Sequence, residues 1–199
     1  MHGPNAMAER AESRVVGGMS ILNASVMGWF SAAALLSGCV SSSVVKPPDA
    51  PERLRPPANQ VLAFETLATG VQIYECADRR DQPALFEWAF RAPEAELFDR
   101  TGRKVGKHYA GPTWESTDGS TVVGELKARD NGPDPNAIPW LLLSAKSHSG
   151  AGVFSQISSI QRLQTVEGKA PSTPCSRDNA QQVARVPYKA AYYFYVPKP

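Results

Sequence analysis

The segment KHYAGPTWESTDGS (residues 107–120) combines two aromatic residues, a histidine, two acids and two turn signals in one short stretch. Gly111-Pro112 is typical of a corner between two extended runs. Asp118-Gly119 is typical of a two-residue type I′ hairpin, in which both central residues have positive φ. Turns spaced this closely predict consecutive antiparallel strands. We therefore expect the rest of the mature chain to form a β-scaffold around this segment.

Short apolar runs separated by turn signals continue on both sides of this segment. Residues 85–91 alternate, so that Phe86, Trp88 and Phe90 share one face. The expected strands cover residues 61–67, 71–76, 85–91, 95–99, 104–109, 113–117, 120–129, 140–146, 153–165 and 188–196. No run after residue 60 predicts a long amphipathic helix. The pattern predicts an all-β domain, either an antiparallel β-sandwich or a small β-barrel with long loops, and it does not distinguish the two.

The N-terminal part of the chain has the composition of an export signal. Arg10 and Arg14 precede a stretch without charged side chains, and the apolar run 19–36 leads into Leu36-Ser37-Gly38-Cys39. This ending resembles the lipobox of bacterial lipoproteins. The resemblance implies cleavage before Cys39, a diacylglycerol on its thiol, and acylation of its new amino group. Several buried acyl chains would anchor the protein firmly to a membrane.

The lipoprotein resemblance also predicts a location and a domain organisation. The residue after the cysteine is Val40 and not an aspartate, which favours the outer over the inner membrane if the host is Gram-negative. We expect a signal peptide over residues 1–38, a Ser/Pro-rich tether over 39–59, and a single all-β domain over 60–199.

Two other interpretations of the N-terminus stay open. Residues 19–36 are near the lower length limit for a retained membrane-spanning helix. A start at Met7 or Met19 would shorten the positively charged region and leave the lipobox intact.

The charge and the cysteines limit the classes of partner. The formal charge of +2, from 21 basic and 19 acidic residues, gives no concentrated basic face, so we expect no nucleic-acid partner. With Cys39 acylated, Cys76 and Cys175 remain, and in an oxidising compartment we expect them to form a disulfide. A metal pair or a catalytic thiol has no support, because no CxxC spacing exists and no histidine is near either cysteine in sequence.

Seven motifs in order resemble one known family. They are GVQIYEC (70–76), PEA (93–95), GKHYAGPTWE (106–115), DGS (118–120), IPWLLL (138–143), IQR (160–162) and RVPY (185–188). Together they resemble the bacterial and fungal domain of unknown function 3455, over about residues 60 to 196. The resemblance implies an exported, largely β domain and no particular activity.

Some fungal relatives in that family carry a malate dehydrogenase label, which this sequence does not support. Gly150-Ala151-Gly152 lacks the third glycine of a dinucleotide fingerprint, since Ser155 stands there, and no βαβ unit follows. We therefore expect no cofactor.

The candidate catalytic residues are His108, Glu115 and Asp118. If the Gly111-Pro112 corner brings positions 108 and 115 together, His108 would act as a base or metal ligand with a carboxylate. In the structural alternative, Glu115 pairs with Lys107 on the neighbouring strand and Asp118 serves the turn.

The second histidine of the mature chain, His148, lies in a polar loop. Two histidines exclude a three-histidine zinc site, although a site with Glu115 or Asp118 would remain open. We expect no metal. We also expect no serine nucleophile, because no G-x-S-x-G motif occurs.

The candidate ligand-binding residues are Tyr109 and Trp114, which we expect to be exposed beside the Gly-Pro corner, whereas Trp88 and Trp140 are expected in the core. These features predict a lipid-anchored envelope protein that binds a small molecule, a glycan or another envelope component, and not an enzyme. The alternatives are a hydrolase that uses His108 with Glu115 or Asp118, and a purely structural envelope lipoprotein.

Overall fold

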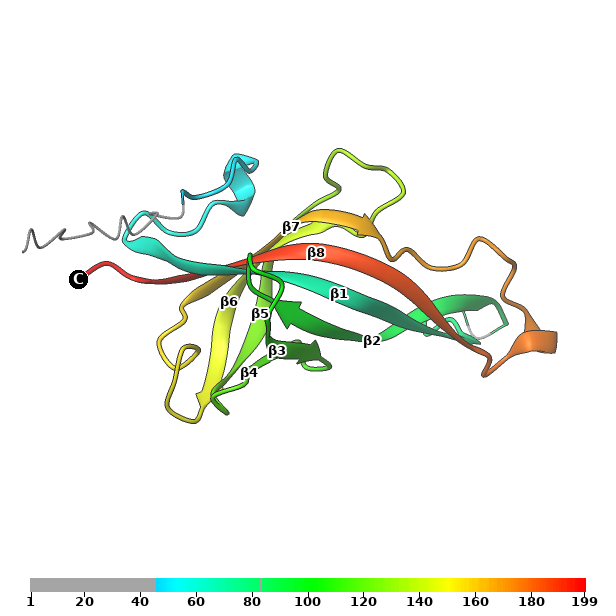
Figure 1. Ribbon diagram of the computed structural model, residues 1–199. Coiled ribbons are helices and arrows are strands. Elements are labelled where there is room, and N and C mark those ends of the chain that lie inside the picture. The colour runs from blue at the N-terminus through cyan, green and yellow to red at the C-terminus, as the bar shows by residue number, and fades with distance from the viewer. Residues whose placement is uncertain (1–45, 83) are drawn as a thin grey trace, which may run out of the picture. The chain divides into compact units, whose positions relative to one another are not determined.

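The fold is an eight-stranded antiparallel barrel. The computed structural model describes residues 46–82 and 84–199, so the expected signal peptide and Cys39 lie outside the described residues. Consecutive strands pair in chain order, and β8 pairs with β1 to close the barrel (Figure 1). The all-β prediction is confirmed, and barrel closure decides between the two architectures left open.

Within the described residues, the secondary structure consists of eight strands and two short 3-10 helices. The elements are η1 (Glu52–Leu54), β1 (Gln60–Asp78), β2 (Phe86–Phe98), β3 (Lys104–Tyr109), β4 (Thr113–Ser116), β5 (Thr121–Asp130), β6 (Trp140–Ser149), β7 (Ser159–Glu167), η2 (Arg177–Asn179) and β8 (Val183–Pro197). In the described part of the chain, no helix is long and apolar enough to cross a membrane.

Strands β1 and β2 are longer than expected. Ala68-Thr69-Gly70 continues β1 and is not a turn, because Gly70 marks a close approach of β2. A Cβ at that position would lie 2.1 Å from the Glu94 carbonyl oxygen. In β2, Pro93 pairs only with β1, since β3 begins its pairing at Ala95. A proline is tolerated in a strand where one side has no ladder partner.

The turn at Asp118-Gly119 joins β4 to β5, but the predicted type I′ geometry is wrong. Of the two residues, only Gly119 has a positive φ, of 84°. Its N–H donates to the Ser116 carbonyl over 3.0 Å, which makes a four-residue turn ending in a left-handed glycine. Asp118 stabilises this turn by accepting a hydrogen bond from the Ser120 backbone at 2.9 Å.

One end of the barrel is closed by the loop of residues 150–158, of which 153–158 were expected to begin a long strand; β7 begins only at Ser159. Phe154 and Ile157 of this loop are buried in the barrel core. Two hydrogen bonds hold the loop to the β4–β5 turn. Val153 N–H donates to Asp118 over 2.9 Å, and Phe154 N–H donates to the Ser120 hydroxyl over 3.1 Å.

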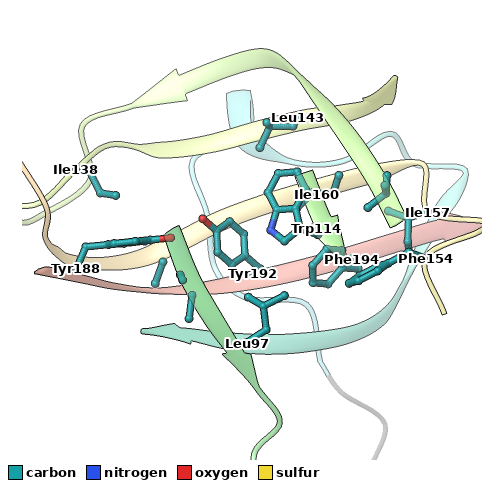
Figure 2. Packing of buried hydrophobic residues seen from close by; sticks show 14 residues of the cluster. Leu97, Trp114, Ile138, Leu143, Phe154, Ile157, Ile160, Tyr188, Tyr192 and Phe194 are labelled. Atoms are coloured by element: carbon teal, nitrogen blue, oxygen red, sulfur yellow. The ribbon is translucent and has the colours of Figure 1, made fainter. Parts of the chain in front are cut away.

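The core follows from the period-two alternation of β8. Even-numbered residues from Tyr188 to Phe194 point into the barrel, and Ala191, Tyr193 and Tyr195 point outward. At the closed end the ring of Phe194 lies 4.9 Å from the rings of both Phe64 and Phe154. Figure 2 shows Phe154 and Phe194 at one side of the interior, Tyr188 at the other, and Tyr192 between them beside Trp114.

The outward face of β8 is covered by the segment before β1, which corrects the expected tether boundary. Leu54 of η1 is fully buried against Tyr193 and Tyr195. Its carbonyl accepts a hydrogen bond from Gln161 Nε2 at 2.5 Å, and Gln161 Oε1 accepts one from the Tyr195 hydroxyl. The packed part of the chain therefore includes Ala50 and η1 and does not begin at Gln60.

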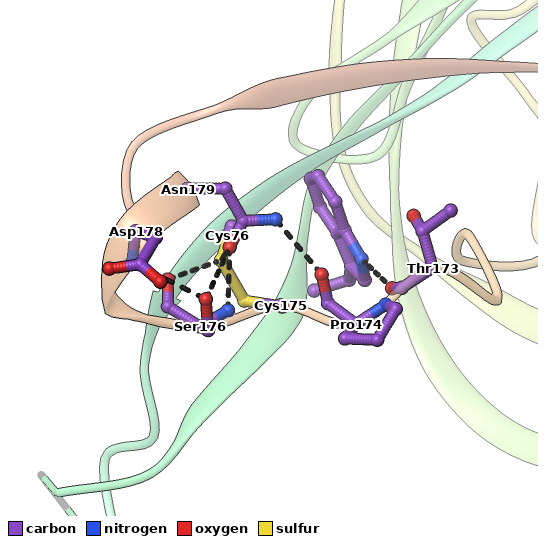
Figure 3. The surroundings of a disulfide bond; sticks show 8 residues. Cys76, Thr173, Pro174, Cys175, Ser176, Asp178 and Asn179 are labelled. Atoms are coloured by element: carbon purple, nitrogen blue, oxygen red, sulfur yellow. Dashed lines mark hydrogen bonds between the residues drawn. A yellow bond between two sulfur atoms is a disulfide. The ribbon is translucent and has the colours of Figure 1, made fainter.

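The predicted disulfide between Cys76 and Cys175 is confirmed, and it lies outside the barrel proper (Figure 3). It ties the end of β1 to the loop before β8 and closes a loop with a sequence separation of 99 residues. A loop of that size stabilises the folded state by about 4–5 kcal/mol in the chain-entropy model. Trp88 lies here, donating to the Thr173 carbonyl at 2.9 Å. Trp88 belongs to neither hydrophobic cluster, so the prediction that it is a core residue is wrong, whereas Trp140 packs half-buried against the outer cluster.

The packing of η1 makes a testable prediction. Leu54→Ala should lower the free energy of unfolding by about 2–4 kcal/mol, because it removes a fully buried leucine from the outer cluster. Leu67→Ala is the matched control, since Leu67 is 44% exposed, and it should cost less than about 0.5 kcal/mol. Urea denaturation would measure both, and equal effects would show that η1 does not stabilise the barrel.

Candidate ligand-binding site

A cavity of about 630 Å³ enters the barrel at the end opposite the 150–158 loop. Residues from all eight strands or their connections contribute to its wall, which no single segment of the sequence could build. The lining residues are Gln72, Tyr74, Phe90, Arg91, Pro93, His108, Ala110, Gly111, Pro112, Trp114, Leu126, Arg129, Ile138, Pro139, Leu141, Leu143, Arg162 and Tyr192.

The inner wall of the cavity is an aromatic cluster from β3, β4 and β8. The rings of His108 and Trp114 stack at 4.4 Å with an interplanar angle of 16°, and Tyr192 lies 5.1 Å from His108. Gly124 makes room for this arrangement, because a Cβ there would lie 2.9 Å from the Trp114 ring. The stack is fixed by register, since His108 and Trp114 are directly paired across β3 and β4.

His108 is a neutral side chain in this setting. It is 3% exposed, and its Nδ1 lies 2.8 Å from the Thr113 carbonyl, to which the Nδ1–H donates. Burial lowers the pKa of His108 from 6.5 to about 3; the hydrogen bond to Thr113 only partly offsets this, and the positive charge of Arg162 adds to the lowering. With Nδ1 as the donor, Nε2 carries the lone pair.

The buried polar groups in and beside the cavity wall include several without a partner. Among the described residues, Gln72 Nε2, Trp114 Nε1 and the Tyr192 hydroxyl in the wall, and the Tyr188 hydroxyl beside it, have no partner in good hydrogen-bond geometry. Figure 2 shows the two tyrosine hydroxyls pointing toward each other. A buried donor without a partner costs about 1–3 kcal/mol, so a bound molecule or water at these groups would be stabilising.

Glu115 and Asp118 do not join His108. The β3–β4 register pairs His108 with Trp114 and Lys107 with Glu115, so Glu115 projects from the opposite face of the sheet. There it contacts Lys107 Nζ at 3.1 Å and the Tyr109 hydroxyl at 2.9 Å, and these two hydrogen bonds lower its pKa. The prediction that positions 108 and 115 meet is wrong, because the residue opposite His108 on β4 is Trp114, one position before Glu115.

Asp118 and His148 both serve the closed end. Hydrogen bonds from Ser120 and the Val153 backbone lower the pKa of Asp118 to about 2. His148 Nε2 lies 2.7 Å from the Ile157 carbonyl, in the same loop. Within residues 46–82 and 84–199, no three His, Cys, Asp or Glu side chains are grouped to hold a metal ion.

The structure separates the two aromatic candidates. Trp114 lines the cavity, but it is 1% exposed, so the prediction that it is an exposed residue is wrong. Tyr109 lies half-buried outside the barrel, where its hydroxyl bonds Glu115 and Lys107 lies over its ring. Only Trp114 is therefore placed to contact a molecule in the cavity.

Residues 56–196 match a family described as a protein of unknown function (DUF3455). The chain belongs to this family. A comparison with curated proteins returned no match.

Most of the cavity residues in this DUF3455 domain were not predicted from the sequence, Gln72 and Arg162 among them. Gln72, Arg162 and Tyr192 come from β1, β7 and β8, and barrel closure brings them together. The available signal was a polar residue at an inward position between apolar neighbours, as with Gln72 between Val71 and Ile73. Alternation alone does not reveal which face is inward, so the signal could not be read without the register.

The neutral state of His108 predicts a specific acid sensitivity. Because its folded pKa of about 3 lies below its unfolded value, the unfolded chain binds the extra proton between these values, and stability falls as pH drops from about 6.5 to 3. Between pH 7 and pH 4.5, the His108→Gln variant should lose about 2–3 kcal/mol less stability than the wild type.

Urea denaturation at both pH values would measure this difference, and NMR of the histidine ring signals would test its cause directly. A titration midpoint for His108 near 6.5 would contradict the neutral, buried assignment.

Proposed function

We propose that this protein is a lipid-anchored protein of the cell envelope whose barrel binds a small molecule in the open cavity. The observation that carries the proposal is the set of buried, unpartnered polar groups at the cavity wall, on Gln72, Trp114 and Tyr192. Such groups are expensive in a barrel core that serves only stability, whereas they fix the orientation of a ligand in a binding site.

The size and the composition of the cavity support the same proposal. An eight-stranded barrel has an interior just wide enough to be filled by side chains or to hold one small ligand. The volume of about 630 Å³ lies within the range of small-molecule sites, roughly 300–1,000 Å³. Apolar surface from Leu141, Leu143 and Ile138 surrounds the few polar groups, as in such sites.

The proposed anchor rests on the leader sequence. An uncharged apolar run that ends in Leu36-Ser37-Gly38-Cys39 supports lipidation at Cys39, and Val40 after it supports sorting to an outer membrane. A disulfide between Cys76 and Cys175 is in keeping with an oxidising compartment.

The arrangement of His108, Glu115 and Asp118 does not support the hydrolase alternative. His108 lies inside the barrel, and neither Glu115 nor Asp118 reaches its ring. A purely structural lipoprotein remains the contrast to ligand binding, and it predicts that no small molecule raises the melting temperature.

A screen for ligands by thermal shift tests the binding function. At least one compound in a panel of metabolites and glycans should raise Tm in the wild type and not in Leu141→Trp. Leu141 lines the cavity beside Arg162 on the neighbouring strand, and a larger ring there would fill the cavity. Val183→Trp is the matched control, since Val183 is 58% exposed on β8. The control should respond as the wild type does, and an unchanged Tm across the whole panel would reject the proposal.

The anchor is tested separately by mass spectrometry and fractionation. The wild type should begin at Cys39, carry the mass of its acyl chains and sediment with membranes, and Cys39→Ser should lose both the added mass and the membrane association. An unacylated full-length wild type would reject the anchor and leave the binding function untouched.

A further inference from the structure

The charged residues of the cavity are all of one sign. Three arginines line it, and no aspartate or glutamate does among the described residues. Arg91 is paired with Glu75 at 2.9 Å. Arg129 and Arg162 form no ion pair in the described part of the chain. Two uncompensated guanidinium groups therefore face the cavity.

Arg162 is the inner one of these two residues. Its register places it directly beside Leu141 on β6 and Tyr192 on β8, both of which line the cavity. Its Nε and Nη2 both donate to the Pro139 carbonyl, at 3.1 and 2.9 Å. The neutral Pro139 carbonyl orients the Arg162 guanidinium group but does not neutralise its positive charge. The guanidinium group keeps further N–H donors for another acceptor.

Other hydrogen-bond donors line the same cavity as Arg162. The Tyr192 hydroxyl, Gln72 Nε2 and Trp114 Nε1 are buried there, and none of them has a partner in good hydrogen-bond geometry among the described residues. His108 is neutral here and adds no charge of its own at physiological pH. The buried wall of the cavity thus offers a positive charge and several hydrogen-bond donors, an arrangement suited to an anionic oxygen group.

The mouth of the cavity has the opposite character. Phe90 and Leu126 line it and are 51% and 54% exposed, so apolar surface faces solvent at the entrance. Phe90 is held in place by an edge-on contact with Tyr74 at 5.7 Å. An occupant that covers this surface has an apolar body on the solvent side of its polar group.

We propose that the ligand is an apolar carboxylate that enters carboxylate first and binds Arg162, with its hydrocarbon or aromatic body between Phe90 and Leu126. This inference rests on the proposed binding function and specifies the chemistry of its ligand. The carboxylate is held by Arg162 and the surrounding donors, and the rim arginine Arg129 has a lesser role.

Calorimetry on the full chain with decanoate, 2-naphthoate and the methyl ester of each tests the proposal. At least one carboxylate should bind, and its ester should bind about ten-fold more weakly or worse, because it lacks the charge. The acid that binds more tightly shows whether the apolar part of the ligand is an acyl chain or an aromatic ring. This comparison uses only the wild type and does not depend on the folding of any variant.

Two variants test the orientation of the ligand. Arg162→Gln should weaken carboxylate binding about ten-fold or more and leave ester binding unchanged, whereas Arg129→Gln should change carboxylate binding less than about three-fold. Circular dichroism and Tm would check that both variants fold. A larger loss in Arg129→Gln than in Arg162→Gln would overturn the carboxylate-first orientation.

The possible outcomes distinguish a failure of the carboxylate inference from a failure of the proposed binding function. Esters that bind as tightly as the acids would overturn the carboxylate and leave a binding cavity for neutral apolar molecules. Failure of both acids and both esters, with a ligand of other chemistry found in the thermal-shift screen, would overturn the carboxylate alone. Failure of the probes and of the whole screen would overturn both.

Discussion

The pairing of β1 with β8 is the interaction on which the rest of the molecule depends. It runs from Gln60 opposite Pro197 to Glu75 opposite Val183, and it turns an eight-stranded meander into a barrel without free edges. Closure gives every strand an inside and an outside. It also brings Thr66 of β1 into one row with Tyr192 of β8 and Arg162 of β7, at the other end of the chain.

Within that closed sheet, the interior changes character along the barrel axis. The end near Phe64, Phe154 and Phe194 is packed with rings and sealed by the 150–158 loop. Toward the other end, β8 presents tyrosines in place of phenylalanine, and burial raises the pKa of the Tyr192 hydroxyl. Strand β8 therefore contributes Phe194 to the apolar core and Tyr192 to the wall of the cavity. The packed core and the cavity lie at different positions along the barrel axis.

Local patterns in the sequence predicted the strands well where turn chemistry and alternation agreed, as at Lys104–Tyr109. They failed at Gly70, because a glycine needed for close strand approach looks the same as a turn glycine. The cavity was harder to predict. Cross-strand register decides which residues point into the barrel. The observed register differs by one residue from the expected one, so Trp114 points inward and Glu115 points outward.

The packing of η1 on the barrel limits the distance between the barrel and the proposed lipid anchor. If Cys39 is acylated as proposed, eleven residue steps separate it from Ala50, which packs with Leu54 in the outer cluster. Fully extended, that stretch spans at most about 40 Å. The proposed anchor would therefore hold the barrel within about 40 Å of the bilayer surface.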